Sequence, residues 1–201
     1  MTPDGIMGKG TIDGNEYSDS DLVKRCASGD LRSQEFLYRR YFSFAMSVCV
    51  RYTGDENEAM EIVNDSYMKV LDSLSDYDSS RPFKSWYGKI LVNTAIDHYR
   101  KNLKHNDYIP INTITEISEL EPEIETELSV NDILTLFRHL PVNYKITFNL
   151  FEIEGYTHEE IGQMMGVTAS TSRANLARAK KILRELYRKY ITQGKKGHEE
   201  L

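Results

Sequence analysis

Apolar residues recur along most of the chain at the three- and four-residue spacing that places them on one face of a helix. The stretch from Leu22 to Tyr52 has this spacing, and Gly29 and Asp30 interrupt it, which predicts a short helix followed by a longer one. The same spacing predicts a third helix from about Glu56 to Leu74 and a fourth from roughly Phe83 to Asn102. Sustained two-residue alternation is absent from the sequence, so we expect an all-α fold.

One stretch without helical spacing divides the chain. Residues 104–128 contain two prolines and many acids, and helix signals then resume near Val130 and again from Val142 to Glu154. We therefore expect two small helical domains joined by a flexible acidic linker. The expected boundaries are a disordered leader over 1–17, a first domain over 18–103, the linker over 104–128, a second domain over 129–190 and a flexible tail over 191–201.

Residues 155–183 read GYTHEEIGQMMGVTASTSRANLARAKKIL and predict two helices joined by a tight turn. Thr157 and Glu160 have the spacing of a capping box, and Thr168 or Ser170 can cap the second helix. A second helix rich in Ser, Thr, Asn and Arg is typical of a helix-turn-helix, whose recognition helix enters the major groove of DNA. The alternative interpretation is an ordinary amphipathic helical hairpin with a solvated basic face.

The expected faces of this second helix follow from its spacing. Polar side chains near its N-terminal end read base edges, and cations further along contact phosphates. We expect outward side chains at Thr171, Ser172, Arg173 and Asn175, phosphate contacts at Arg178, Lys180 and Lys181, and inward side chains at Leu176, Ala179, Leu183 and Leu186.

The predicted fourth helix combines aromatic and basic residues in the stretch RPFKSWYGKILVNTAIDHYRKN. Aromatic side chains such as Trp86 stack on unpaired bases, and cations such as Arg100 and Lys101 follow a single-stranded backbone. Asn93 lies mid-helix, where its amide can read a base extruded from the duplex. The residues alone leave open a second interpretation, in which the aromatic side chains are core residues.

The net charge of −6 conceals a segregation of charge along the sequence. Nine basic residues and one acid lie between Arg173 and Lys196, whereas seven acids and no base lie between Glu116 and Asp132. A local basic face attracts phosphate whatever the total charge. The sequence lacks a long apolar run and a signal peptide, so we expect a cytoplasmic protein without membrane insertion. Cys26 and Cys49 are expected to be buried thiols, and the scattered histidines predict neither a metal site nor a cofactor.

Taken in order, these segments resemble a sigma factor of bacterial RNA polymerase, of the extracytoplasmic-function (ECF) type of the sigma-70 family. The resemblance covers about residues 19–187. EAMEIVNDSYMKVLDSL is similar to the segment that docks on the clamp helices of the polymerase's largest subunit. FKSWYGKILVNTAIDHYRK resembles the family pattern of an F..W pair followed by I..N...D..R, and residues 140–183 match the family's C-terminal helix-turn-helix almost throughout.

The resemblance implies a transcription initiation factor, not an enzyme, that binds core RNA polymerase, directs it to −35 and −10 promoter elements and promotes strand melting. The implied polymerase-docking positions are Asn64, Asp65, Met68 and Lys69. The implied −10 positions are Trp86, Asn93, Asp97, Arg100 and Lys101, with Asn93 lining the pocket for a flipped base. The implied −35 positions are Thr171, Ser172, Arg173, Asn175, Arg178 and Lys181.

The partners implied by the resemblance are the clamp helices, the flap of the second-largest polymerase subunit, promoter DNA and an anti-sigma factor. Phe148 and Leu150 lie on the helix that helps to face the flap in the family. The chain departs from the family pattern at Ser172, where an aliphatic residue is usual, and at Asn175, where arginine is frequent.

Two other functions compete with a sigma factor. A stand-alone helix-turn-helix regulator leaves the aromatic–basic helix and the docking segment unexplained. A helical enzyme acting on nucleic acid needs a carboxylate cluster, a nucleophile–base pair or a phosphate-binding glycine loop, and the sequence supplies none of them.

Overall fold

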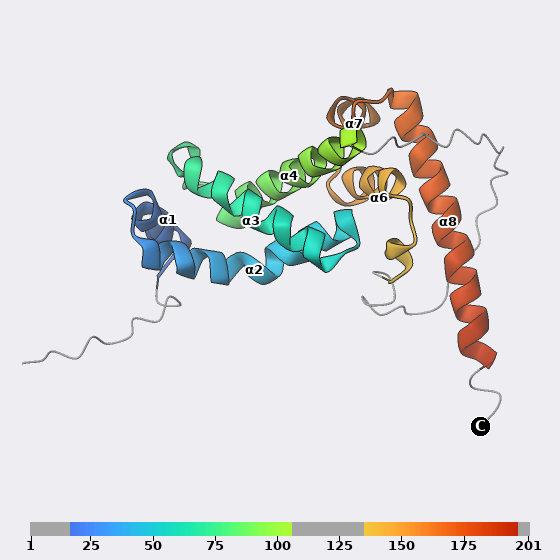
Figure 1. The fold of residues 1–201 in the computed structure, drawn as a ribbon, viewed down its shortest axis with the longest axis horizontal. Coiled ribbons are helices and arrows are strands. Elements are labelled where there is room, and N and C mark those ends of the chain that lie inside the picture. Colours follow the sequence, from blue (N-terminus) through green and yellow to red (C-terminus); the bar gives the residue numbers. More distant parts are fainter. Residues whose placement is uncertain (1–16, 106–134, 197–201) are drawn as a thin grey trace, which may run out of the picture.

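The computed structural model describes residues 17–105 and 135–196, and these residues form helices joined by turns (Figure 1). The expectation of an all-α fold is confirmed. The elements are α1 (Asp19–Ala27), α2 (Leu31–Thr53), α3 (Glu56–Asp72), the 3-10 turn η2 (Leu74–Asp76), α4 (Phe83–His105), α6 (Val142–Phe148), the π-helical turn η3 (Asn149–Ile153), α7 (His158–Met165) and α8 (Ala169–Lys196).

Local side-chain caps set where the first helices begin. Ser18, Asp30 and Asp55 are the N-caps of α1, α2 and α3, and each side chain accepts a hydrogen bond from a backbone N–H of the first turn. Gly54 ends α2 in the left-handed conformation, with φ of 79°. These capping signals are local in sequence, so they mark the ends of the same helices that the spacing of apolar residues predicts.

Several boundaries differ from the sequence-based expectation. α4 continues to His105, and α8 continues to Lys196, six residues beyond the expected domain boundary at residue 190. The helix expected over 142–154 has a π-turn in its second half, where the Glu154 N–H donates to the Asn149 carbonyl at 3.0 Å. The predicted leader, apart from Tyr17, and the linker from residue 106 onward lie outside the described residues.

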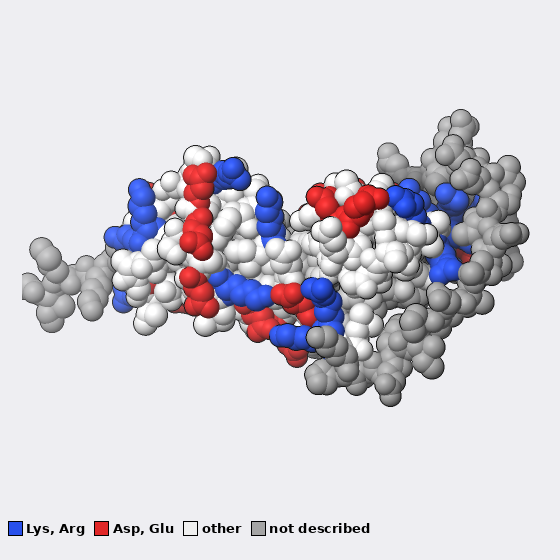
Figure 2. Space-filling view, turned by 90° about the horizontal axis from the view of Figure 1, so that it is seen from above, with Lys and Arg blue, Asp and Glu red and all other residues white. Residues whose placement is uncertain are grey.

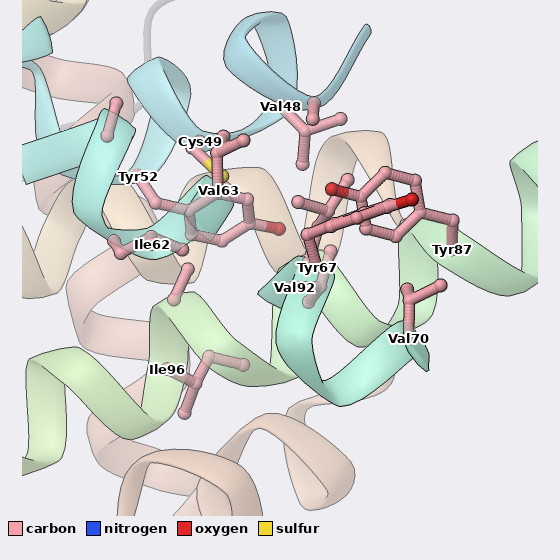
Figure 3. Packing of buried hydrophobic residues seen from close by; sticks show 14 of the residues in the cluster. Val48, Cys49, Tyr52, Ile62, Val63, Tyr67, Val70, Tyr87, Val92 and Ile96 are labelled. Atoms are coloured by element: carbon pink, nitrogen blue, oxygen red, sulfur yellow. The ribbon is translucent and has the colours of Figure 1, made fainter. Parts of the chain in front are cut away.

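Helices α1 to α4 pack around one core in which α3 and α4 cover the inner side of α2 (Figure 3). Tyr52, Ile62 and Tyr87 are among the largest side chains that are fully buried there. Cys26 and Cys49 are free thiols in the same core, as expected, and burial raises the pKa of Cys49 to about 12. None of the described helices combines the length and apolarity needed to cross a membrane.

The second module packs directly on the first. Ile146 of α6 and Leu150 of η3 belong to the same apolar cluster as the α1–α4 core, and α6 contacts the C-terminal end of α2. The Lys145 ammonium donates to the Thr53 carbonyl at 3.1 Å, and the Asn149 amide donates to the Arg51 carbonyl at 2.6 Å. Both bonds satisfy carbonyls at the end of α2 that have no partner within that helix.

Candidate nucleic-acid interface

One side of α4 exposes the polar side chains that the sequence assigned to the −10 element. Asn93, Asp97, Arg100 and Lys101 are exposed and follow one another at helical spacing. The opposite side of the same helix is buried, with Leu91, Val92, Ala95 and Ile96 at most 3% exposed. The core therefore fixes the rotation of α4 so that its polar side faces solvent.

The aromatic residues at the start of α4 divide between core and surface. Phe83 and Tyr87 are each 1% exposed, so for these two the interpretation as core residues is right. Trp86 is half-buried, and its ring centroid lies 5.1 Å from that of Tyr77 and 5.6 Å from that of Phe83. Trp86 is thus the aromatic residue of this group that retains a surface beside the polar side of α4.

The docking residues implied by the resemblance form an exposed face of α3. Asn64, Asp65, Met68 and Lys69 are all exposed, and Met68 is 59% exposed although it is apolar. The Lys69 ammonium lies 3.2 Å from the Asp97 carboxylate of α4. This ion pair joins the α3 face to the polar side of α4, so the two predicted sites are adjacent.

The helix-turn-helix has the local geometry that the sequence predicts. Thr157 and Glu160 form both hydrogen bonds of the capping box of α7, and Thr168 caps α8 by accepting from the Thr171 N–H at 3.0 Å. Gly166 adopts the left-handed conformation at the end of α7, with φ of 71°. Gly162 allows α7 to pack closely against the turn, because a Cβ there would lie 2.8 Å from the Val167 carbonyl oxygen.

Exposed polar residues of α8 begin at its N-terminal end, where Thr171 and Arg173 lie on the surface. The Arg173 guanidinium pairs with the Glu159 carboxylate of α7 at 2.7 Å. Arg178 is half-buried with Nη1 3.5 Å from the Tyr144 hydroxyl, and Lys181 is also half-buried. Acidic and basic side chains are intermixed on the face seen from above, rather than gathered by sign (Figure 2).

The structure corrects two outward-facing assignments on α8 and one expected contact. Ser172 is 0% and Asn175 is 4% exposed, so the prediction that they face outward on the recognition helix is wrong. With Leu176 and Ala179 they form the stripe of α8 that packs against α6 and α7. Leu150 is 0% exposed and belongs to the core, so it is not available to contact the flap of the polymerase.

Family comparison places both modules in one known family. Sigma-70 region 2 matches residues 37–104, and Sigma-70 region 4 matches residues 131–183. The chain belongs to the sigma-70 family of RNA polymerase sigma factors. The two regions occur in the order expected from the sequence, and the chain is a promoter-directing sigma factor rather than a stand-alone regulator.

Curated relatives of this sigma factor include RNA polymerase sigma factor SigV of Bacillus subtilis, which is 32% identical over 133 residues, covering 66% of this chain and 78% of SigV. The ECF RNA polymerase sigma-E factor of Haemophilus influenzae is 24% identical over 179 residues, covering 84% of this chain and 94% of that protein. Such relatives place the chain in the ECF type. Among solved structures, the sigma factor RpoE in complex with the anti-sigma factor NepR from Bartonella quintana is 18% identical, covers 77% of this chain and 96% of that chain, and has a TM-score of 0.47.

Sequence reasoning missed three polar residues of the sigma factor that the tertiary structure buries or half-buries. Lys145 and Asn149 bind the end of α2, and burial lowers the pKa of the Lys145 ammonium. His158 lies between α7 and α8 with Nδ1 2.9 Å from the Ser172 hydroxyl oxygen. A lysine and an asparagine four residues apart within the run YKITFNLF were the available signal, because a polar residue inside an apolar helix face needs a partner.

Proposed function

We propose that this sigma factor binds core RNA polymerase through the exposed face of α3, captures the −10 element on α4 and reads the −35 element with α8. The observation that carries the proposal is the polar side of α4, where Asn93, Asp97, Arg100 and Lys101 are exposed above a buried apolar side. Adjacent to it, the α3 face offers an exposed apolar side chain, Met68, within a polar surround. In this proposal the sigma factor acts by binding polymerase and DNA rather than by catalysis.

Strand opening at the −10 element is the step that Asn93 serves in this proposal. The Asn93 amide is exposed and has both donor and acceptor groups, as reading a Watson–Crick edge requires. Extruding a base costs a few kcal/mol, which binding of the extruded base offsets. Trp86 supplies a partly exposed ring for stacking, and Arg100 and Lys101 supply positive charge for the backbone.

At the −35 element, we propose that Thr171 and Arg173 face the groove and that Arg178 and Lys181 lie toward phosphates. The ion pair between Arg173 and Glu159 competes only weakly with binding of the Arg173 side chain to DNA. Both side chains are more than half exposed, and exposed ion pairs contribute about 0–1 kcal/mol. Ser172 and Asn175 do not enter this proposal because both are buried.

The packing of the two modules is incompatible with simultaneous contact to both elements on straight DNA. Elements about 25 base pairs apart are separated by about 85 Å at 3.4 Å per base pair. Helix lengths of about 1.5 Å per residue place Asn93 and Arg173 within about 50 Å of each other, through the contacting helices α4 and α7. We therefore propose that the modules separate when the sigma factor engages a promoter.

The contact between the modules has features that favour separation. A cavity of about 160 Å³ lies there, and Tyr52, His98 and Val142 contribute to its lining. The buried Asn149 Oδ1 has no hydrogen-bond partner among the described residues. Buried polar groups without full pairing weaken an interface by about 1–3 kcal/mol each. The covalent connection allows separation, since a chain as long as residues 106–134 can reach about 100 Å.

Transcription in vitro with purified core polymerase tests the proposed function. We expect the wild-type chain to co-purify with core enzyme and to select start sites on a promoter library. Met68→Glu should weaken core binding by tenfold or more, whereas Leu31→Glu should not. Leu31 is a matched control, because it is an apolar side chain of similar size that is 76% exposed and lies on a different helix, α2. Failure of the wild-type chain to bind core enzyme, or equal losses in the two variants, would contradict the proposal.

An anti-sigma protein is the further partner that we propose, on the strength of the sequence resemblance. Co-expression of the chain with candidate proteins encoded beside it should yield a complex that no longer binds core polymerase. A complex that binds core polymerase as well as the free chain does would contradict this proposal.

A further inference from the structure

Two polar pairs join α7 to α8 within the helix-turn-helix. His158 Nδ1 lies 2.9 Å from the Ser172 hydroxyl oxygen, and the Glu159 carboxylate lies 2.7 Å from the Arg173 guanidinium. Consecutive residues of one helix therefore bind consecutive residues of the other. The pairs differ in environment, because Ser172 is 0% exposed whereas the Glu159 and Arg173 side chains are 64% and 57% exposed.

The His158 ring is held on its face as well as at its edge. It stacks on the Phe151 ring of η3 with centroids 4.4 Å apart and an angle of 18° between the planes. Burial, followed by the nearby Arg173 guanidinium, lowers the pKa of His158 against the opposing effect of Glu159, and Lys180 of α8 also lowers it. A neutral ring pairs with the Ser172 hydroxyl as acceptor or as donor, so the bond forms in either tautomer.

The pair supplies a second fixed point between α7 and α8. The first is the turn, where Gly162 packs so closely that a Cβ would meet the Val167 carbonyl oxygen at 2.8 Å and the Ala169 N at 3.3 Å. The turn and this pair are separated along both helices, so together they restrict the angle between α7 and α8 more than the turn does alone. His158 lies one turn of α7 before Gly162, and Ser172 lies one turn of α8 beyond the turn.

We propose that His158 and Ser172 are positioning residues that set the angle at which α8 is presented to the −35 element, without touching DNA themselves. The inference rests on the proposed role of α8 in −35 recognition. Ser172 is buried between the exposed residues Thr171 and Arg173, so a rotation of α8 about this point moves both of them. A displacement of about 1 Å is enough to weaken directional contacts of this kind.

The test uses holoenzyme reconstituted from the full chain and the core RNA polymerase of its host. A double-stranded −35 duplex is first selected from a randomised library with the wild-type holoenzyme. Affinity for this duplex is then compared among wild type, Ser172→Ala, His158→Phe and the double variant. Phenylalanine keeps the stack on Phe151 but removes the hydrogen bond, and Gln163→Ala is the control for an exposed change on α7.

We expect each single substitution to weaken binding of the duplex by about two- to tenfold, which corresponds to the net contribution of one hydrogen bond. The double variant should bind no more than twofold worse than either single variant, because both remove the same bond. Ser172→Thr, which keeps the hydroxyl, should bind better than Ser172→Ala. Gln163→Ala should match wild type, and every variant should bind a forked −10 probe as wild type does.

Three results would overturn the inference: unchanged duplex affinity in both single variants, additive losses in the double variant, or equal losses on the duplex and the forked −10 probe. The last result would indicate a general loss of folding. A wild-type holoenzyme that selects no −35 duplex would instead refute the proposed role of α8, and the inference with it.

Discussion

Replacement of Gly54 by alanine tests the contact between the two modules. Gly54 has φ of 79°, and a Cβ built there would lie 2.4 Å from the Lys145 ammonium nitrogen. An alanine in the left-handed conformation costs about 1–2 kcal/mol. The Cβ also displaces the ammonium from the Thr53 carbonyl, and loss of a hydrogen bond from a charged donor costs about 1.5–3 kcal/mol. We therefore expect Gly54→Ala to lower the free energy of unfolding by about 2.5–5 kcal/mol.

Gly29 provides the matched control for this substitution. Its φ is 86°, and a Cβ there would meet nothing within 4 Å, so Gly29→Ala should cost about 1–2 kcal/mol from backbone strain alone. Urea denaturation of both variants measures the difference, which we expect to be about 1.5–3 kcal/mol. In a Lys145→Met background this difference should disappear. Equal costs for the two alanines in the otherwise wild-type chain would refute the contact between Lys145 and the end of α2.

Three further predictions concern the promoter site, the helix-turn-helix and the thiols. Asn93→Ala should reduce permanganate reactivity of melted −10 thymines while leaving −35 duplex binding unchanged, and parallel losses would contradict the role of Asn93 in strand opening. Because the pKa of His158 lies below its usual 6.5 in the folded chain, the unfolded chain takes up this proton first as pH falls. The contribution of His158 to stability should therefore be constant above about pH 7 and decline below about pH 6.5, and titration of stability in wild type and His158→Phe checks this. Burial raises the pKa of Cys26 to about 11 and that of Cys49 to about 12, so neither thiol should react with Ellman's reagent at pH 8 until the chain is denatured, and rapid native reaction would show that the core opens.

Much of the fold is local in origin and could be predicted from the sequence. The N-caps at Ser18, Asp30 and Asp55 and the capping box of α7 are each formed within a few residues. The helical spacing of apolar residues predicts which side of each helix is buried. The sequence therefore located the helix-turn-helix, and its resemblance to known regions identified the family.

Only part of the candidate site can be predicted from the sequence. Asn93 and Asp97 are exposed as expected, since their neighbours on α4 are plainly apolar. The sequence pattern predicts the wrong side of α8 for Ser172 and Asn175, because a polar side chain usually faces solvent whereas these two are buried. The sequence does not decide whether Trp86 lies on the surface or in the core, because stacking on DNA and packing in a core both favour an aromatic side chain.

Tertiary structure decided which polar groups are inside. Ser172 is buried because His158, fourteen positions away, supplies its hydrogen bond, and Lys145 is buried because the open carbonyls of α2 lie 92 positions away. Partners so far apart in the sequence change neither the local helix propensity nor the spacing of apolar residues. The sequence pattern therefore does not reveal them. By itself the sequence determined the helices, their caps and the family to which they belong. The side that α8 presents and the contact between the two modules depend on groups that only folding brings together, because an unpaired polar group inside costs more than one in water.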